Sequence, residues 1–496
     1  MTTIDRLDLP PRPRRPSPLV RLLGPTPDAY TPYATLPKVR RVQRWFLGLL
    51  GVTLVGYAII NKSFAYIGVA PIFIGEVCLL LGVASLFGCA WSSLKGTLRL
   101  AVPLLLFMGW GAVCTFPYFN EHQFDALRDG VIWGYGFFAL ILCALVLDKP
   151  TRLRWMVRYY GIFSVIFLVV APATMIFIRA VGGDNLGRGV PTFPGTEIPL
   201  AFIKGGDIGV HLAGVFGYAV LLGSLPTVFL LLTIPLNGAL MQSSRAALVC
   251  FGTSLVPYFA YRPRHKIGWL LLGWLLVGFT LLWSSGFVWA PEGEKREFSA
   301  KNIIQSVQSL VGAGGHEEMN HTAKWRMWWW EDIVEYTFDG PYFWYGKGYG
   351  VNLADSDGFQ VEFDETPLRS PHNGHLTVLA RSGVPGLGLW VACHASLMLL
   401  LTARLWEAHR RGDEAWARAL LWLGTMHVIF LINATFDVFL EGPMGGIWFW
   451  SIFGVALAAA ELSRTHPGLL DGAVKTDGRP VGRTRNRLKR IAARVR

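Results

Sequence analysis

Long apolar segments, separated by short polar ones, run through most of this chain. A helix needs about 20 apolar residues to cross the hydrocarbon core of a bilayer. With 52% hydrophobic and 16% charged residues, the chain is too apolar for a soluble domain of its length. The pattern predicts an all-α polytopic membrane protein with 12 transmembrane helices, at 45–60, 64–87, 98–116, 131–147, 156–178, 208–222, 228–241, 246–261, 267–287, 384–405, 419–432 and 445–460.

One long polar segment interrupts this pattern before the tenth span. The sequence therefore divides into five parts. We expect a disordered basic arm at 1–43, nine spans within 44–287, a large loop at 288–376, three spans within 377–462 and a basic tail at 463–496.

The distribution of Lys and Arg predicts the orientation of the spans. Short cytoplasmic loops of membrane proteins are enriched in Lys and Arg. Both terminal segments and alternate short loops are basic, which places both termini in the cytoplasm and the 288–376 loop on the outer side of the cytoplasmic (inner) membrane. The net charge of +13 lies mostly in these segments. It suits contact with anionic lipids, so we expect no nucleic-acid partner.

Neither the cysteines nor the HxxH pair predicts a metal site or a disulfide framework. All six cysteines fall inside or at the edge of apolar spans. His372 and His375 could ligate a metal together with Asp364 or Glu365, but no third ligand stands at a set spacing. The DxD spelling at 355–357 lies in an acidic stretch. We expect no metal and no cofactor.

The large loop contains two recognisable local patterns. Residues 322–338 carry Trp, Ile, Val and Tyr at helical spacing, which predicts an amphipathic helix suited to the membrane interface. The segment 291–320 before it reads as mobile surface. A flexible turn follows at 346–350, with the sequence Gly-Lys-Gly-Tyr-Gly. That turn lacks the spacing of a phosphate-binding loop.

Four basic residues lie near the predicted outer ends of spans, where the charge rule disfavours them. They are Arg128, Lys204, Arg245 and Arg326. Binding of an anion explains such positions, and extension of the side chains to lipid headgroups is the alternative. Arg245 is the clearest case because it ends a tight polar turn between two apolar helices.

His372 is the best candidate for acid–base chemistry. It stands where the large loop returns to the membrane, directly before Asn373-Gly374, which starts the next helix. Imidazole titrates near physiological pH, so a histidine here can accept a proton, although it could also serve only as a polar cap. Asp437 and Glu76 are carboxylates in or beside apolar segments, suited to charge pairing or to a proton relay.

These residues together resemble a known family. His372-Asn373 followed by Gly383 and Gly386 is similar to the signature of the O-antigen ligase and Wzy-type polysaccharide polymerase family of bacterial membrane glycosyltransferases. Ser244-Arg245 resembles the family's Ser-Arg turn. Arg326 with Trp330 resembles its Arg-x-x-x-Trp helix, and the glycine turn at 346–350 resembles the one before its histidine. The likeness extends over about 228–460.

The resemblance implies a metal-independent, inverting glycosyltransferase. Its donor would be a glycan on undecaprenyl diphosphate, and its acceptor another glycan or the lipid A core. Arg245 and Arg326 would hold the diphosphate and His372 would act on the acceptor hydroxyl. Arg128, Lys204, Asn373, His375 and Asp437 are the accessory candidates. Ligase and polymerase remain equal alternatives, and a transporter or flippase of lipid-linked glycans is the rival interpretation.

Overall fold

The computed structural model describes residues 37–474, except 70–71, 182–188, 195, 197, 224, 242–243, 264–265, 289–298, 311–316 and 361–367. Most of the predicted basic arm and most of the predicted tail therefore lie outside the described residues. Helix α2 begins at Pro37, so its first turn falls within the arm.

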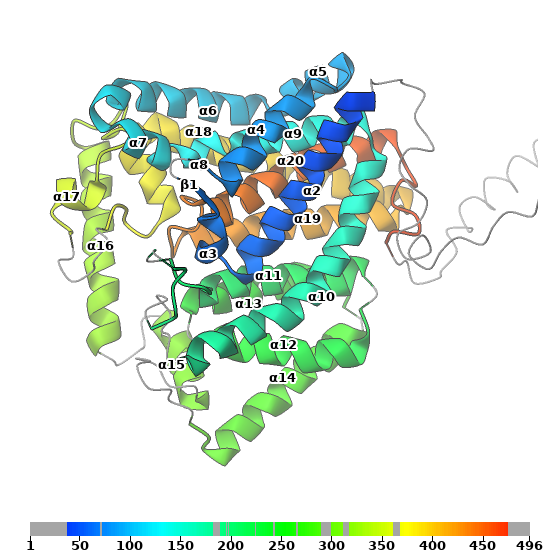
Figure 1. Cartoon of the computed structure of the whole chain (residues 1–496). Helices are drawn as coiled ribbons and strands as arrows, with labels where there is room; N and C mark the ends of the chain where they lie inside the picture. Colours follow the sequence, from blue (N-terminus) through cyan, green and yellow to red (C-terminus); the bar gives the residue numbers. More distant parts are fainter. Residues whose placement is uncertain are drawn as a thin grey trace, which may run out of the picture. The chain divides into compact units, whose positions relative to one another are not determined.

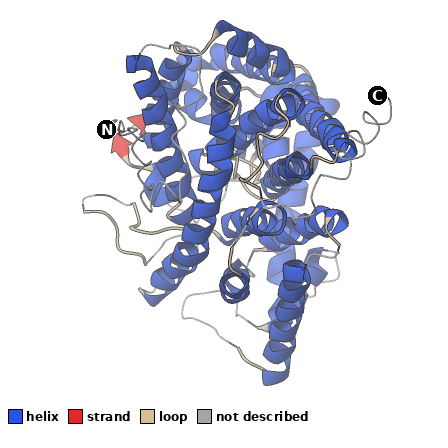
Figure 2. Ribbon diagram, turned by 90° about the vertical axis from the view of Figure 1, so that its right-hand side faces the viewer, coloured by secondary structure: helices blue, strands red, loops and turns tan. Residues whose placement is uncertain are grey.

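Helices dominate the described residues (Figures 1 and 2). The regular strands there are β1 and β2, one short antiparallel pair with Gly68 opposite Phe73 and Val69 opposite Ile72. The elements are α2 Pro37–Ile59, α3 Lys62–Ala65, β1 Gly68–Val69, β2 Ile72–Phe73, α4 Ile74–Leu86, α5 Trp91–Leu100, α6 Val102–Thr115, α7 Phe119–Asp129, α8 Val131–Gly134, α9 Gly136–Asp148, α10 Thr151–Ala180, α11 Gly205–Gly217, α12 Thr227–Met241, α13 Arg245–Tyr261, α14 Lys266–Ser285, α15 Ala300–Leu310, α16 Glu317–Phe338, α17 Leu353–Asp357, α18 Gly374–Arg411, α19 Glu414–Ala434 and α20 Pro443–Thr465.

The fold class is that of an all-α polytopic membrane protein. Within the described residues, 9 helices are long and apolar enough to cross a membrane, and Ile74–Leu86 and Thr227–Gly238 are shorter apolar helices. The predicted span 246–261 forms α13, which has 17 residues. The count of 12 spans stays a prediction.

The predicted span 64–87 was wrong in its first part. Phe64 belongs to the short helix α3, a strand pair follows, and the apolar helix α4 begins only at Ile74. Gly68 in β1 has a φ of 141°, a conformation that interrupts a helix and that a side chain disfavours. The apolar residues before Ile74 therefore form a hairpin, which periodicity alone did not distinguish from helix.

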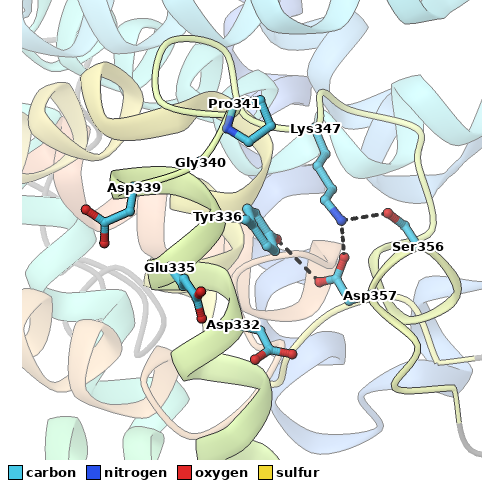
Figure 3. A pocket seen from close by; sticks show the side chains of 9 residues that line it. All are labelled: Asp332, Glu335, Tyr336, Asp339, Gly340, Pro341, Lys347, Ser356 and Asp357. Atoms are coloured by element: carbon cyan, nitrogen blue, oxygen red, sulfur yellow. Dashed lines mark hydrogen bonds and ion pairs between the residues drawn. The ribbon is translucent and has the colours of Figure 1, made fainter.

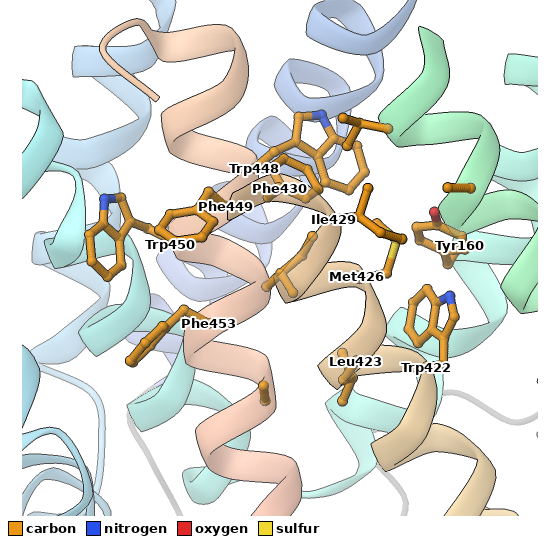
Figure 4. Packing of buried hydrophobic residues seen from close by; sticks show 14 of the residues in the cluster. Tyr160, Trp422, Leu423, Met426, Ile429, Phe430, Trp448, Phe449, Trp450 and Phe453 are labelled. Atoms are coloured by element: carbon orange, nitrogen blue, oxygen red, sulfur yellow. The ribbon is translucent and has the colours of Figure 1, made fainter. Parts of the chain in front are cut away.

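Close packing of aromatic and small residues holds the centre of the bundle together. Tyr160 and Trp422 meet edge to face beside Met426 of α19, and Phe449 of α20 packs against Phe430 of α19 (Figure 4). Gly454 of α20 lies so close to α9 that a Cβ there would overlap the backbone of Ala139. Small residues let helix backbones approach in a membrane, where apolar burial alone gives little preference for helix association.

The helix ends form two chemically distinct groups. At one end of the bundle, the starts of α11, α13 and α18 lie near the end of α19. Here Asn61 Nδ2 donates to Asp207 Oδ2 at 2.6 Å. We call this end of the bundle the site end. At the opposite end, Arg411 donates to the Ser463 carbonyl at 2.7 Å and Tyr261 donates to Glu414 at 3.2 Å.

The large loop packs its main helix against α18. The prediction of a helix at 322–338 is confirmed, and α16 begins earlier, at Glu317. Its Trp329 and Ile333 are fully buried against Leu379 and Ala380 of α18. Part of the segment expected to be mobile surface is instead helix α15; residues 291–298 and 311–316 lie outside the described residues.

Two glycines allow the loop backbone to cross α18. Gly383 interrupts the helical dihedral angles of α18 with a φ of 67°, and Val384 N donates to Phe343 O at 2.8 Å across the gap. Gly346, with a φ of 63°, faces the Ala380 carbonyl from the other side. A Cβ at either glycine would overlap the opposing backbone. These signature glycines therefore serve backbone contact.

Candidate functional site

His372 sits in a strained turn at the start of α18. The side-chain oxygen of Asn373 accepts hydrogen bonds from the backbone of His375 at 3.0 Å and Leu376 at 3.2 Å, which confirms Asn373 as the residue that begins this helix. His372 has a φ of 54°, in a region that non-glycine residues rarely occupy. Such strain persists only where the surroundings hold it, and it concentrates at functional sites.

Asp437 lies between the two basic groups His372 and Lys204. Its Oδ1 is 3.7 Å from His372 Nδ1, and its Oδ2 is 3.3 Å from Lys204 Nζ. The first distance is too long for a hydrogen bond but short enough for strong electrostatic attraction to an imidazolium. The structure thus brings together three residues from the start of α11, the turn after α19 and the turn before α18.

Their electrostatics reflect the same arrangement. Burial is the largest single effect on the pKa of Asp437 and acts to raise it. Lys204 and His372 together outweigh burial and hold this pKa below its usual range. For Lys204, burial acts to lower the pKa, and the neighbouring Asp437 and Asp207 carboxylates raise it above its usual value. Both groups therefore stay charged near neutral pH.

Arg326 reaches the same turn from α16. Its Nη1 donates to the Phe436 carbonyl at 3.2 Å, directly before Asp437. One turn further along α16, Trp330 Nε1 donates to the Pro371 carbonyl at 2.9 Å, directly before His372. The Nε of Arg326 has no hydrogen-bond partner among the described residues. The pair Arg326 and Trp330 thus joins α16 to both halves of the site.

Arg245 stands at the first position of α13. Ser244 caps this helix, its Oγ accepting from Ala247 N at 3.3 Å. Close packing of Gly209 on Ala247 places the first turn of α11 beside that of α13. Burial is the main reason that the pKa of Arg245 is lowered. For Arg326, burial also lowers the pKa, and repulsion from Arg245 adds to this effect. Two mutually repelling guanidinium groups thus share the site.

Arg128 pairs with carboxylates of its own helix, α7. Its distances are 3.2 Å to Asp125 and 3.4 Å to Asp129. The contacts of Arg128 are thus with these two carboxylates. Lys204 and Arg326 instead contact the turn after α19, Lys204 through Asp437 and Arg326 through the Phe436 carbonyl.

Both ring nitrogens of His375 form hydrogen bonds within the protein. Trp390 Nε1 lies 3.0 Å from His375 Nδ1, and an indole N–H can only donate, so this imidazole nitrogen accepts. Its Nε2, 3.0 Å from the Leu431 carbonyl, then carries the proton and donates. Both ring nitrogens are thus engaged: Nδ1 within α18, and Nε2 in a contact that holds α18 to α19. Asp364 and Glu365, the other candidates for an HxxH metal site, lie outside the described residues.

The acidic stretch at 355–357 also makes contacts that hold the large loop together. Asp357 accepts from Trp329 at 2.6 Å and from Tyr336 at 3.3 Å, and it pairs with Lys347. Tyr336, Lys347 and Asp357 border a pocket of about 470 Å³ (Figure 3), whose lining also includes Asp332, Glu335, Asp339, Gly340, Pro341 and Ser356. Among the residues that the structure describes, no three His, Cys, Asp or Glu side chains could hold a metal ion together.

Asp129 is an important residue that sequence reasoning missed. Its Oδ2 is 2.9 Å from Arg369 Nη2 and 3.0 Å from Arg381 Nη2, and it accepts from Gly350 N at 3.2 Å. These contacts tie α7 to the glycine turn, to the loop three residues before His372 and to α18. Its run Arg-Asp-Gly gave no signal, because the partners lie more than 200 positions away.

The fold and the site together describe a multi-pass membrane protein with clustered cations, a carboxylate and an imidazole near the ends of its spans. Residues 228–391 match the O-antigen ligase family model. The match includes Arg245, Arg326 and His372, and it confirms the resemblance seen in the sequence. No curated protein matches the chain.

Replacing Asp129 should disturb the His372 loop strongly. Asp129→Asn leaves the buried Arg381 without its carboxylate, and loss of one partner of a buried pair costs about 3–5 kcal/mol. We expect a clear drop in melting temperature and faster proteolysis near 369. The control is Asp125→Asn, whose half-exposed carboxylate also pairs with Arg369 and should cost less than about 1 kcal/mol. Equal effects of the two variants would contradict the role given to Asp129.

Proposed function

We propose that the protein is a membrane glycosyltransferase that ligates or polymerises glycan units carried on undecaprenyl diphosphate. The observation that carries the proposal is the convergence of Lys204, Arg245, Arg326, His372 and Asp437 at the site end. The match of residues 228–391 to the O-antigen ligase family supports it.

The cations suit a diphosphate leaving group. Bringing Arg245 near Arg326 is unfavourable in the free protein, since like charges repel and both groups are partly desolvated. A bound diphosphate relieves this repulsion and accepts charge-assisted hydrogen bonds. The starts of α11 and α13 add the positive ends of two helix dipoles. This environment stabilises the negative charge that develops as the glycosidic bond to diphosphate breaks.

His372 is placed to act as general base. In the proposed step the acceptor hydroxyl oxygen attacks the anomeric carbon, the bond from that carbon to the diphosphate oxygen breaks, and the hydroxyl proton moves to His372. This single displacement inverts the anomeric configuration. Asp437, 3.7 Å from His372 Nδ1, stabilises the imidazolium that forms. In this mechanism arginine side chains perform the charge stabilisation that a metal ion would otherwise supply.

The charge rule supports an outer-side location. Basic residues such as Arg152, Arg411 and Arg418 lie at the end of the bundle opposite the site, where they bind backbone or carboxylate groups. We therefore propose that the site faces outward from the cytoplasmic membrane and that both termini are cytoplasmic. The acceptor is either a second lipid-linked glycan or the lipid A core.

Loss of either site arginine should abolish transfer. We expect Arg245→Ala and Arg326→Ala each to reduce the rate about 10²-fold or more at equal expression, since each removes a contact to the departing diphosphate. Lysine should restore little, because it lacks the forked geometry. Arg404→Ala, at the far end of α18 and paired with Glu407, is the control and should remain active. Near-normal transfer by Arg245→Ala would refute its role.

The role of His372 is tested by substitution and chelation together. His372→Ala should lower the rate about 10²-fold or more, and EDTA should have no effect. Full activity of His372→Gln would leave His372 with only a capping role.

Cysteine labelling tests the orientation. Ser356 and Thr465 are exposed residues of the large loop and of the end of α20, respectively. In intact cells, an impermeant thiol reagent should label Ser356→Cys and should not label Thr465→Cys until the membrane is opened. The reverse pattern would place the site on the cytoplasmic side.

A further inference from the structure

Asn433, near the end of α19, is a fully buried side chain without a partner. Its exposure is 0%, and neither Nδ2 nor Oδ1 has a hydrogen-bond partner among the described residues. Leaving a buried amide unpaired costs on the order of 1–3 kcal/mol, so most buried polar groups are paired and an exception calls for an explanation. Water or a ligand group that binds there would remove this cost.

The amide of Asn433 faces the first turns of two neighbouring helices. A Cβ added to Gly206, in the first turn of α11, would lie 3.3 Å from Asn433 Oδ1 and 4.0 Å from Asn433 Nδ2. The same position is 3.5 Å from Ser244 Oγ, at the start of α13. Because Gly206 has no side chain, the Asn433 amide and the Ser244 hydroxyl both lie close to the backbone of this first turn of α11.

The start of α11 is suited to an anion. Lys204 precedes this 13-residue helix and makes no side-chain capping hydrogen bond. The first N–H groups of a helix have no intrahelical acceptor, and the helix dipole is positive there. Asp207, in the same turn, opposes an anion by its charge, but its Oδ2 is bound to Asn61. Lys204 lies close enough to Asp207 to offset that charge.

The same amide is linked to the site described above. The backbone carbonyl of Asn433 accepts from Phe436 N at 3.0 Å and from Asp437 N at 3.2 Å. Arg326 binds the carbonyl of Phe436 in that turn. Asn433 therefore lies between the start of α11 and the turn that Arg326 contacts.

We propose that Asn433, with the start of α11, forms a second phosphoryl subsite, which recognises a diphosphate rather than a monophosphate. This inference rests on the proposed function. One phosphoryl group binds Arg326 and Arg245, and the adjacent one binds the Asn433 amide and the first N–H groups of α11. Because Asn433 is fully buried in this structure, binding requires the side chains around it to move.

The test compares two lipids on the purified full-length chain in nanodiscs. Affinities for undecaprenyl diphosphate and undecaprenyl monophosphate are measured for the native chain, Asn433→Ala, Asn433→Asp and Arg245→Ala. Asn237→Ala is the matched control, because Asn237 is also a buried asparagine but donates to the Leu168 carbonyl away from the site. Melting temperatures show whether each variant is folded, and Asn433→Asp preserves the side-chain shape.

We expect Asn433→Ala to weaken diphosphate binding about tenfold or more, the loss typical of one hydrogen bond to a charged group. Monophosphate binding should change much less, and Asn433→Asp should bind diphosphate more weakly than Asn433→Ala through repulsion. Asn237→Ala should match the native chain for both lipids.

Equal losses for the two lipids, no loss, or better diphosphate binding by Asn433→Asp than by Asn433→Ala would each overturn the subsite. If the native chain binds no diphosphate, or Arg245→Ala leaves its affinity unchanged, the proposed function itself fails.

Discussion

The ion pair between Lys204 and Asp437 is the interaction on which the arrangement of the site depends. It joins the start of α11 to the turn after α19, two segments separated by 233 positions in the sequence. Asp437 also attracts His372, and the neighbouring Phe436 carbonyl binds Arg326. Without this carboxylate, His372 and Arg326 would lose the negative charge nearest to them, which is costly in a partly buried setting.

The free protein thus holds several unfavourable features in one place. His372 has a left-handed backbone, and within the described part of the chain neither the Nε of Arg326 nor the buried Asn433 amide has a hydrogen-bond partner. Each costs free energy that the rest of the fold must offset. The rigid surroundings do so: Asn373 caps α18, Trp330 holds Pro371, and Asp129 holds the loop through Arg369. A site prepared in this way gains stability when an anion arrives, which favours binding and catalysis over a purely structural role.

Local patterns predicted the fold class and most helices, because apolar length and helical spacing are local properties. They also selected His372, Arg245 and Arg326, since a charged residue at the end of an apolar span is conspicuous by itself. They failed where the answer depended on distant contacts. The segment before Ile74 is apolar in either a hairpin or a helix. Asp129 and Asn433 lie in unremarkable local sequence; the contacts of Asp129 and the burial of Asn433 appear only in the folded chain.

The signature glycines illustrate why a motif is not the same as a site. Gly383 breaks α18 so that Val384 can donate to Phe343 in the large loop, and Trp110 of α6 donates to the Ser382 carbonyl that the break exposes. A continuous helix would satisfy these groups internally and leave the loop with no backbone anchor. The break therefore fixes α16, and hence Arg326, relative to the start of α18, and hence His372. The glycines thus set the distance between Arg326 and His372 through backbone contacts.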